Sequence, residues 1–181
     1  EKNAFPNSVV EVATAIPAFI GHTQFARDGN KDLTGIPFRI SSMAEFHSFF
    51  GFAPTLRFGI RPEDSESEDT TNDINVLFPD GSCQLTLPKT FYALYYNMLL
   101  FYANGGGPCY IVSVGDYEHD FKSIDFTNAL LALKKEQEPT LVVVPEAVYM
   151  EEGDCYKVQT AALMHCGNDM KNRFAILDVF N

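Results

Sequence analysis

The C-terminal part of the chain alternates between two hydrophobic patterns, and this alternation constrains the fold more than any other feature. Three short apolar runs, at 109–114 (CYIVSV), 140–146 (TLVVVPE) and 173–180 (RFAILDVF), are rich in β-branched and aromatic residues and predict strands. The segments between them, 123–135 and 154–170, have helical spacing, and Asp154 is a plausible N-cap. This order predicts a mainly parallel sheet flanked by helices, and the continuous apolar runs indicate strands buried on both faces.

The first half of the chain adds further elements to this α/β pattern. We predict a strand at 15–21, a turn-rich loop at 26–35, a second strand at 36–41, a short helix at 42–51 and a long apolar helix at 91–103. Ser42 and Glu45 have the spacing of a capping box at the start of the short helix, and Gly51 suits its end. The helix at 91–103 is apolar on all sides, which indicates burial in the core or against a partner.

An acidic segment interrupts these elements in the middle of the chain. Residues 62–73 contain six acidic residues and no basic or hydrophobic residue, which predicts a solvated loop rather than a calcium site. Residues 74–87 then read as a β-hairpin around Pro79, Asp80 and Gly81. We therefore expect residues 1–181 to form one α/β domain with a mixed, mainly parallel central sheet and a hairpin excursion.

The run Gly105–Gly107 resembles a phosphate-binding loop in composition but has the opposite polarity. A phosphate loop follows a strand and opens a helix, whereas this run follows the helix at 91–103 and precedes the strand at 109–114. Carbonyl groups and the negative end of the helix dipole face such a loop. We interpret it as a helix C-terminus at which Asn104-Gly105 supplies left-handed backbone and Pro108 prevents continuation.

Composition and charge exclude several classes of function. The formal net charge is −11, which argues against binding to nucleic acid or to anionic membrane surfaces. No apolar run approaches the roughly 18–20 residues of a membrane span. The cysteines at 83, 109, 155 and 166 form no C-x-x-C pair, so free, mostly buried thiols are the favoured interpretation and a zinc site is not.

Candidate catalytic or ligand-binding residues are few. None of the histidines at 22, 47, 119 and 165 lies in a recognisable motif, and His165 and Cys166 point about 100° apart on a helix. Asp116, Glu118 and Asp120 follow one strand and Glu146 follows another, where open α/β sheets bind ligands. Solvated loops explain these acids more simply, so we expect no catalytic residue, no cofactor and no metal site.

Four segments, in order, match the pattern of one family: ATAIPAFIGHT (13–23), PFRISSMAEFHSFFG (37–51), LYYNMLLFYANGGGPCYIVSV (94–114) and RFAILDV (173–179). Together they resemble the sheath proteins of contractile phage tails and related injection systems. The most specific match is NGGGPCYIVSV. The resemblance implies a structural subunit without enzymatic activity that is assembled in the cytoplasm and becomes part of a tail-like particle.

The resemblance also implies partners and an incomplete chain. Sheath subunits form stacked rings around an inner tube, so other sheath subunits and the tube protein are the expected partners. The family's usual opening segment and its C-terminal part are not recognisable, so we expect an N-terminal-half fragment that is a monomer or weak dimer alone. The alternative is a small α/β ligand-binding domain or enzyme with its site at the carboxyl ends of the strands.

Overall fold

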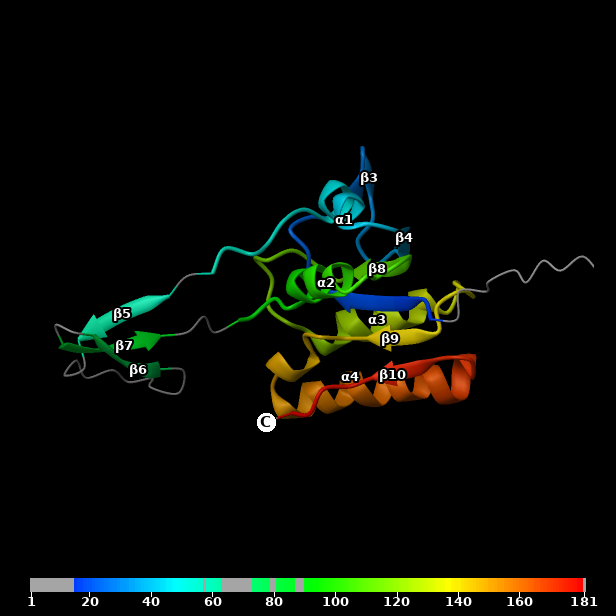
Figure 1. The fold of residues 1–181 in the computed structure, drawn as a ribbon. Helices are drawn as coiled ribbons and strands as arrows, with labels where there is room; N and C mark the ends of the chain where they lie inside the picture. The colour runs from blue at the N-terminus through cyan, green and yellow to red at the C-terminus, as the bar shows by residue number, and fades with distance from the viewer. Residues whose placement is uncertain (1–14, 57, 63–72, 79–80, 87–89, 181) are drawn as a thin grey trace, which may run out of the picture.

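The computed structural model describes residues 15–56, 58–62, 73–78, 81–86 and 90–180, and it has an α/β fold (Figure 1). Its central sheet has five strands in the order β10-β9-β1-β8-β4. The strands are β1 (Pro17–Gly21), β4 (Phe38–Ile40), β8 (Cys109–Ser113), β9 (Leu141–Val143) and β10 (Phe174–Ile176). Strands β1, β8, β9 and β10 run parallel and β4 pairs antiparallel with β8, which confirms the mixed, mainly parallel sheet.

Helices cover both faces of the sheet. The helices are α1 (Met43–Phe50), α2 (Leu94–Ala103), α3 (Ser123–Leu133) and α4 (Glu152–Met164). Ala18 and Ile20 of β1 pack in the cluster formed with α3 and α4, whereas Phe19 packs in the cluster formed with α1 and α2. This alternation follows the two-residue period of a strand.

The α2 face of β9 and β10 is not covered, so the prediction that these strands are buried on both faces is wrong. Leu141 and Val143 are half-buried, and Phe174 and Ile176 are 76% and 50% exposed. Within the described residues the helices on this face pack over β1, β8 and β4 rather than over β9 and β10. Strand β10 also ends at Ile176, earlier than the predicted end near 179.

The excursion is a three-stranded antiparallel sheet, not a hairpin alone. The predicted hairpin is confirmed as β6 (Asp73–Phe78) and β7 (Gly81–Thr86), with its turn residues 79–80 outside the described residues. Strand β5 (Gly59–Pro62) pairs with the other edge of β7 and was not predicted. Most of the acidic loop, residues 63–72, lies outside the described residues. Figure 1 shows this small sheet set apart from the five-stranded sheet.

Short strands also occur where a loop was predicted. Within 26–35, β2 (Arg27–Asp28) and β3 (Lys31–Asp32) form a two-residue antiparallel ladder. Gly29 lies between them at φ +58°, a left-handed conformation that glycine adopts without steric cost.

The helix ends confirm some capping predictions and correct others. Ser42 caps α1 by accepting from the Glu45 N–H, which confirms the predicted N-cap, whereas Glu45 reaches back to the N–H of Ser41, one residue before the cap, rather than to that of Ser42. Asp154 is not the N-cap of α4, because the helix begins at Glu152 and Asp154 lies within its first turn. There the Asp154 carboxylate accepts from Ser123 and Lys157 instead.

The C-terminal ends of α2 and α4 differ in form. Helix α2 begins at Leu94, three residues later than predicted, and ends in a Schellman motif in which the Gly106 N–H donates to Phe101 and the Gly105 N–H to Tyr102. Helix α4 runs into a π-helical turn, η2 (His165–Met170), which ends at a left-handed Lys171.

Among the described helices, none has the length and apolar character needed to cross a membrane.

Candidate functional site at the carboxyl edge of the sheet

Glu146 lies at the carboxyl ends of β1 and β9 and is fully buried. Its Oε2 atom accepts from the backbone N–H of His22 at 2.9 Å and contacts His22 Nδ1 at 2.8 Å. Its Oε1 atom accepts from the N–H of Leu94 at 3.3 Å, at the first residue of α2. The positive end of the helix dipole and the free N–H groups of the first turn favour a carboxylate in this position. Glu146 therefore joins β1, β9 and α2.

The surroundings of His22 and Glu146 are closed to solvent. His22 is 2% exposed, and its ring lies 5.0–5.7 Å, centroid to centroid, from the rings of Tyr92, Phe121 and Phe126. The backbone of Gly21 approaches closely, since a Cβ atom there would lie 2.9 Å from the Leu94 Cβ. The histidine–glutamate pair is thus a packed structural contact, and its carboxylate is not directed at a ligand.

Asp116 and His119 form the other polar contact at this edge. The Asp116 carboxylate accepts from the Glu118 N–H at 2.9 Å and contacts His119 Nδ1 at 2.5 Å. The Glu118 N–H, followed by His119, lowers the pKa of Asp116. Glu118 and Asp120 are exposed, so the predicted group of acids is mostly solvated.

Two open hollows lie beside Asp116. One of about 510 Å³ is lined by Gln24, Tyr92 and Tyr117, and the other of about 420 Å³ is lined by Asp32, His119 and Asp125. Among the described residues, no group of three or more His, Cys, Asp or Glu side chains is arranged to hold a metal ion. Among the described residues, the solvent-accessible part of this edge therefore offers the Asp116–His119 contact rather than a convergent set of ligands.

The glycine run lies in a different place, at the hollow between α2 and the uncovered part of the sheet. This hollow of about 550 Å³ is lined by Gly105–Gly107 together with Leu100, Phe101, Val143 and Ile176, and no Lys or Arg lines it. A Cβ atom on Gly106 would lie 2.5 Å from the Phe101 ring, so close packing requires glycine there. The geometry matches a helix corner at the edge of an apolar groove.

A second buried polar cluster, which the sequence did not indicate, joins α3, η2 and β10. Arg173 is 4% exposed and donates to His165 Nε2 at 2.8 Å, to the Leu133 carbonyl at 3.1 Å and to the Glu136 carbonyl. The guanidinium therefore caps the C-terminus of α3, where carbonyl groups lack partners. Burial, reinforced by Arg173, lowers the pKa of His165 to about 4.

His165 should make the protein sensitive to acid. Its pKa is about 4 in the folded chain against an ordinary value of 6.5, so the unfolded chain binds more protons between these values. The stabilisation from neutral His165 is complete above pH 6.5 and is lost as the pH falls toward 4, by roughly 2 kcal/mol. Urea unfolding at pH 7 and pH 4.5 measures this loss, and His165→Gln should show a smaller one. An equal loss in both proteins would contradict this assignment.

Comparisons with known proteins add no assignment. No protein-family model matches the chain, and no curated protein matches it.

The site residues predicted from the sequence are only partly brought together. Asp116 and Glu146 both follow strands of the same sheet, as expected, but Glu146 is buried in hydrogen bonds and Asp116 contacts His119. The cysteines are free, with Cys109, Cys155 and Cys166 buried and Cys83 partly exposed. Local motifs could not have predicted the partners of Glu146, because His22 is 124 positions away in sequence.

Proposed function

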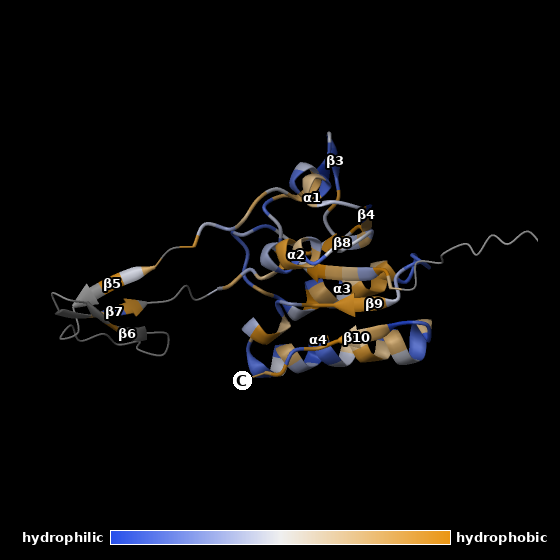
Figure 2. Ribbon diagram, in the orientation of Figure 1, coloured by the Kyte–Doolittle hydropathy of each residue, from blue (hydrophilic) through white to orange (hydrophobic). Residues whose placement is uncertain are grey.

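We propose that this chain is part of a structural subunit of a contractile sheath, of a phage tail or a tail-like injection system. The observation that carries the proposal is the distribution of exposed apolar surface. The groove between α2 and β9–β10 is apolar and open, and it continues onto Phe174 and Ile176 at the outer strand. Figure 2 shows hydrophobic residues, in orange, along β9 and on much of α2, the two elements whose residues line this groove. Exposed apolar surface of this kind is typical of a subunit that is completed by partners.

The polar features of the chain support the same proposal. A subunit that assembles needs no convergent polar pocket, and Glu146, a fully buried carboxylate in the described part of the chain, holds β1, β9 and α2 together. The sequence resemblance covers most of residues 13–179 and includes the run NGGGPCYIVSV, whose first four residues, 104–107, line the groove. Other sheath subunits and the inner tube protein are the partners that this function requires, with assembly in the cytoplasm before the particle is complete.

The proposal is tested by fractionating cells that express the natural protein. Sheath subunits occur in particles of very high mass, so immunoblots should detect the protein in the high-speed pellet together with tail-like particles. A small cytoplasmic enzyme, which stays in the supernatant, is the control. Detection only in the supernatant, under conditions in which particles are produced, would contradict the proposal.

The alternative function, a small α/β enzyme or ligand-binding domain, is favoured by one observation. The Asp116–His119 contact lies beside both hollows at the carboxyl edge, where α/β enzymes bind ligands. Thermal-shift measurements against nucleotides and divalent cations distinguish the two functions. A saturable rise in melting temperature that is lost in Asp116→Asn would support the enzyme and weigh against the sheath subunit.

A further inference from the structure

The outer edge of β10 offers unpaired backbone groups. Strand β10 is the last strand of the sheet, and no other strand in the described part of the chain pairs with its outer side. The Phe174 N–H donates to Thr140 at 2.9 Å, toward β9. Because successive residues of a strand direct their N–H and C=O groups to opposite sides, those of Ala175 point outward. No charge, proline or bulge within Phe174–Ile176 blocks pairing at this edge.

Apolar side chains flank this edge on both faces of the sheet. On the face toward α2, Phe174 and Ile176 are 76% and 50% exposed. On the other face, Tyr156 and Leu163 of α4 are about half exposed and share one side of the helix with Gln159. Gln159 donates to the Asp178 carbonyl, which places that side of α4 next to the chain that leaves β10.

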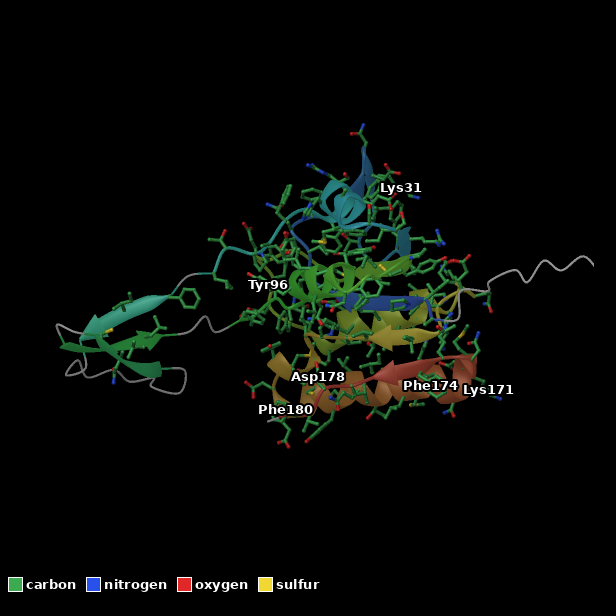
Figure 3. The ribbon with its side chains drawn as sticks, viewed as in Figure 1. Lys31, Tyr96, Lys171, Phe174, Asp178 and Phe180 are labelled. Atoms are coloured by element: carbon green, nitrogen blue, oxygen red, sulfur yellow. The ribbon has the colours of Figure 1, made fainter. Side chains whose placement is uncertain are left out.

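Opposite charges lie at the two ends of the same edge. Figure 3 shows Lys171 just before β10 and Asp178 just after it, at opposite ends of the strand. Both residues are exposed. A second copy that runs antiparallel along this edge, centred on Ala175, would place Lys171 of each copy opposite residue 179 of the other, one position from Asp178, so opposite charges meet at each end of the edge.

We propose that the β10 edge is a self-association site, at which two copies pair β10 to β10 in antiparallel orientation and form one continuous ten-stranded sheet. The twofold axis passes through Ala175, whose outward N–H and C=O exchange two hydrogen bonds with the same residue of the partner. Phe174 then lies opposite Ile176 of the other copy on one face. On the other face the two α4 helices lie side by side through Tyr156 and Leu163.

The same features select a second copy over an unlike strand and set the strength of the contact. An isologous interface must be complementary to itself, and this edge supplies the outward N–H and C=O of Ala175, two apolar flanks and opposite charges at its two ends. Because β10 has three residues, few hydrogen bonds form, and we expect a dissociation constant on the order of 100 µM. The proposal does not depend on the sheath function, because it uses only the surface of this chain.

Sedimentation equilibrium of the chain between about 10 and 500 µM, the range around the expected dissociation constant, tests the proposal. Lys171→Glu should weaken the dimer at least fivefold, because it places Glu one position from Asp178 of the partner. The double variant Lys171→Glu/Asp178→Lys should restore the wild-type dissociation constant to within about twofold, since it reverses both charges of each pair. The matched control is Lys31→Glu, which changes the net charge equally at the β2–β3 hairpin, far from β10 (Figure 3).

Two further variants test the strand pairing itself. Ala175→Pro removes the outward N–H without removing a donor to β9, and Phe174→Lys places a charge on a side chain that is already mostly exposed. Either variant should be a folded monomer at every concentration measured. If Ala175→Pro does not fold, the result for Phe174→Lys alone tests the strand pairing. A monomeric wild type, an equal effect of Lys31→Glu, or failure of the double variant to restore association would each overturn the proposal.

Discussion

Glu146→Ala should lower the free energy of unfolding by about 4 kcal/mol, the largest effect that we expect from a single substitution in this chain. The substitution removes the acceptor of the His22 and Leu94 N–H groups, both in positions that water does not reach. A buried N–H group that has lost its acceptor pays the free-energy cost of dehydration without a hydrogen bond to offset it. The start of α2 and the end of β1 should therefore both be destabilised.

Two companion variants separate this effect from a general loss of charge. Glu146→Gln keeps the shape and one acceptor oxygen, so we expect an intermediate loss of about 2 kcal/mol. Glu118→Ala removes an exposed carboxylate at the same edge of the sheet, and its effect should stay within about 0.5 kcal/mol. Urea unfolding at pH 7 gives all three values. A loss below about 1 kcal/mol for Glu146→Ala would contradict the structural role of this residue.

Arg173→Met should lower the free energy of unfolding by about 3 kcal/mol. Methionine fills much of the same space, but it leaves the Leu133 and Glu136 carbonyls and His165 Nε2 without their donor. None of these three acceptors is a carboxylate, so the guanidinium acts here as a hydrogen-bond donor to a helix end. Burial lowers the pKa of Arg173, in keeping with a cation held by dipoles.

The position of the donor matters as much as its charge. Arg173→Lys keeps the charge but has one nitrogen in place of the planar fork, so it should recover only part of the lost stability. Lys171→Met, which removes an exposed cation two residues away, should change stability by less than about 0.5 kcal/mol. If Arg173→Met were as stable as Lys171→Met, the capping of α3 by Arg173 would be wrong.

The sequence predicted the elements that have a distinct hydrophobic pattern. Strands β1 and β8 are continuous apolar runs and helix α3 has helical spacing, and all three lie close to their expected positions. Strand β5, with the sequence GIRP, was missed because glycine and proline are usually poor strand residues, and its pairing with β7 depends on contacts across the sequence.

Burial and long-range contacts were harder to predict than the elements. The apolar run of β10 is typical of a strand covered on both faces, and nothing local to Phe174 or Ile176 indicates that α2 stops short of them. The partners of Glu146 and Arg173 come from other elements of the fold, so neither residue could be distinguished from an ordinary charged loop residue. Asp116 and Glu146 lie at the carboxyl edge of the sheet, as predicted, but what each carboxylate contacts depends on tertiary packing.

The assignment to a contractile sheath is tested most directly by locating the protein on assembled particles. Antibodies raised against the 181-residue chain would be applied to tail-like particles from the source cells and visualised with gold by electron microscopy. A sheath subunit predicts gold along the outer wall of the particle, and none on stretches of bare inner tube exposed by contraction. Particles that carry no gold along the sheath, while the antibody still detects the protein in the particle-free supernatant, would contradict the assignment.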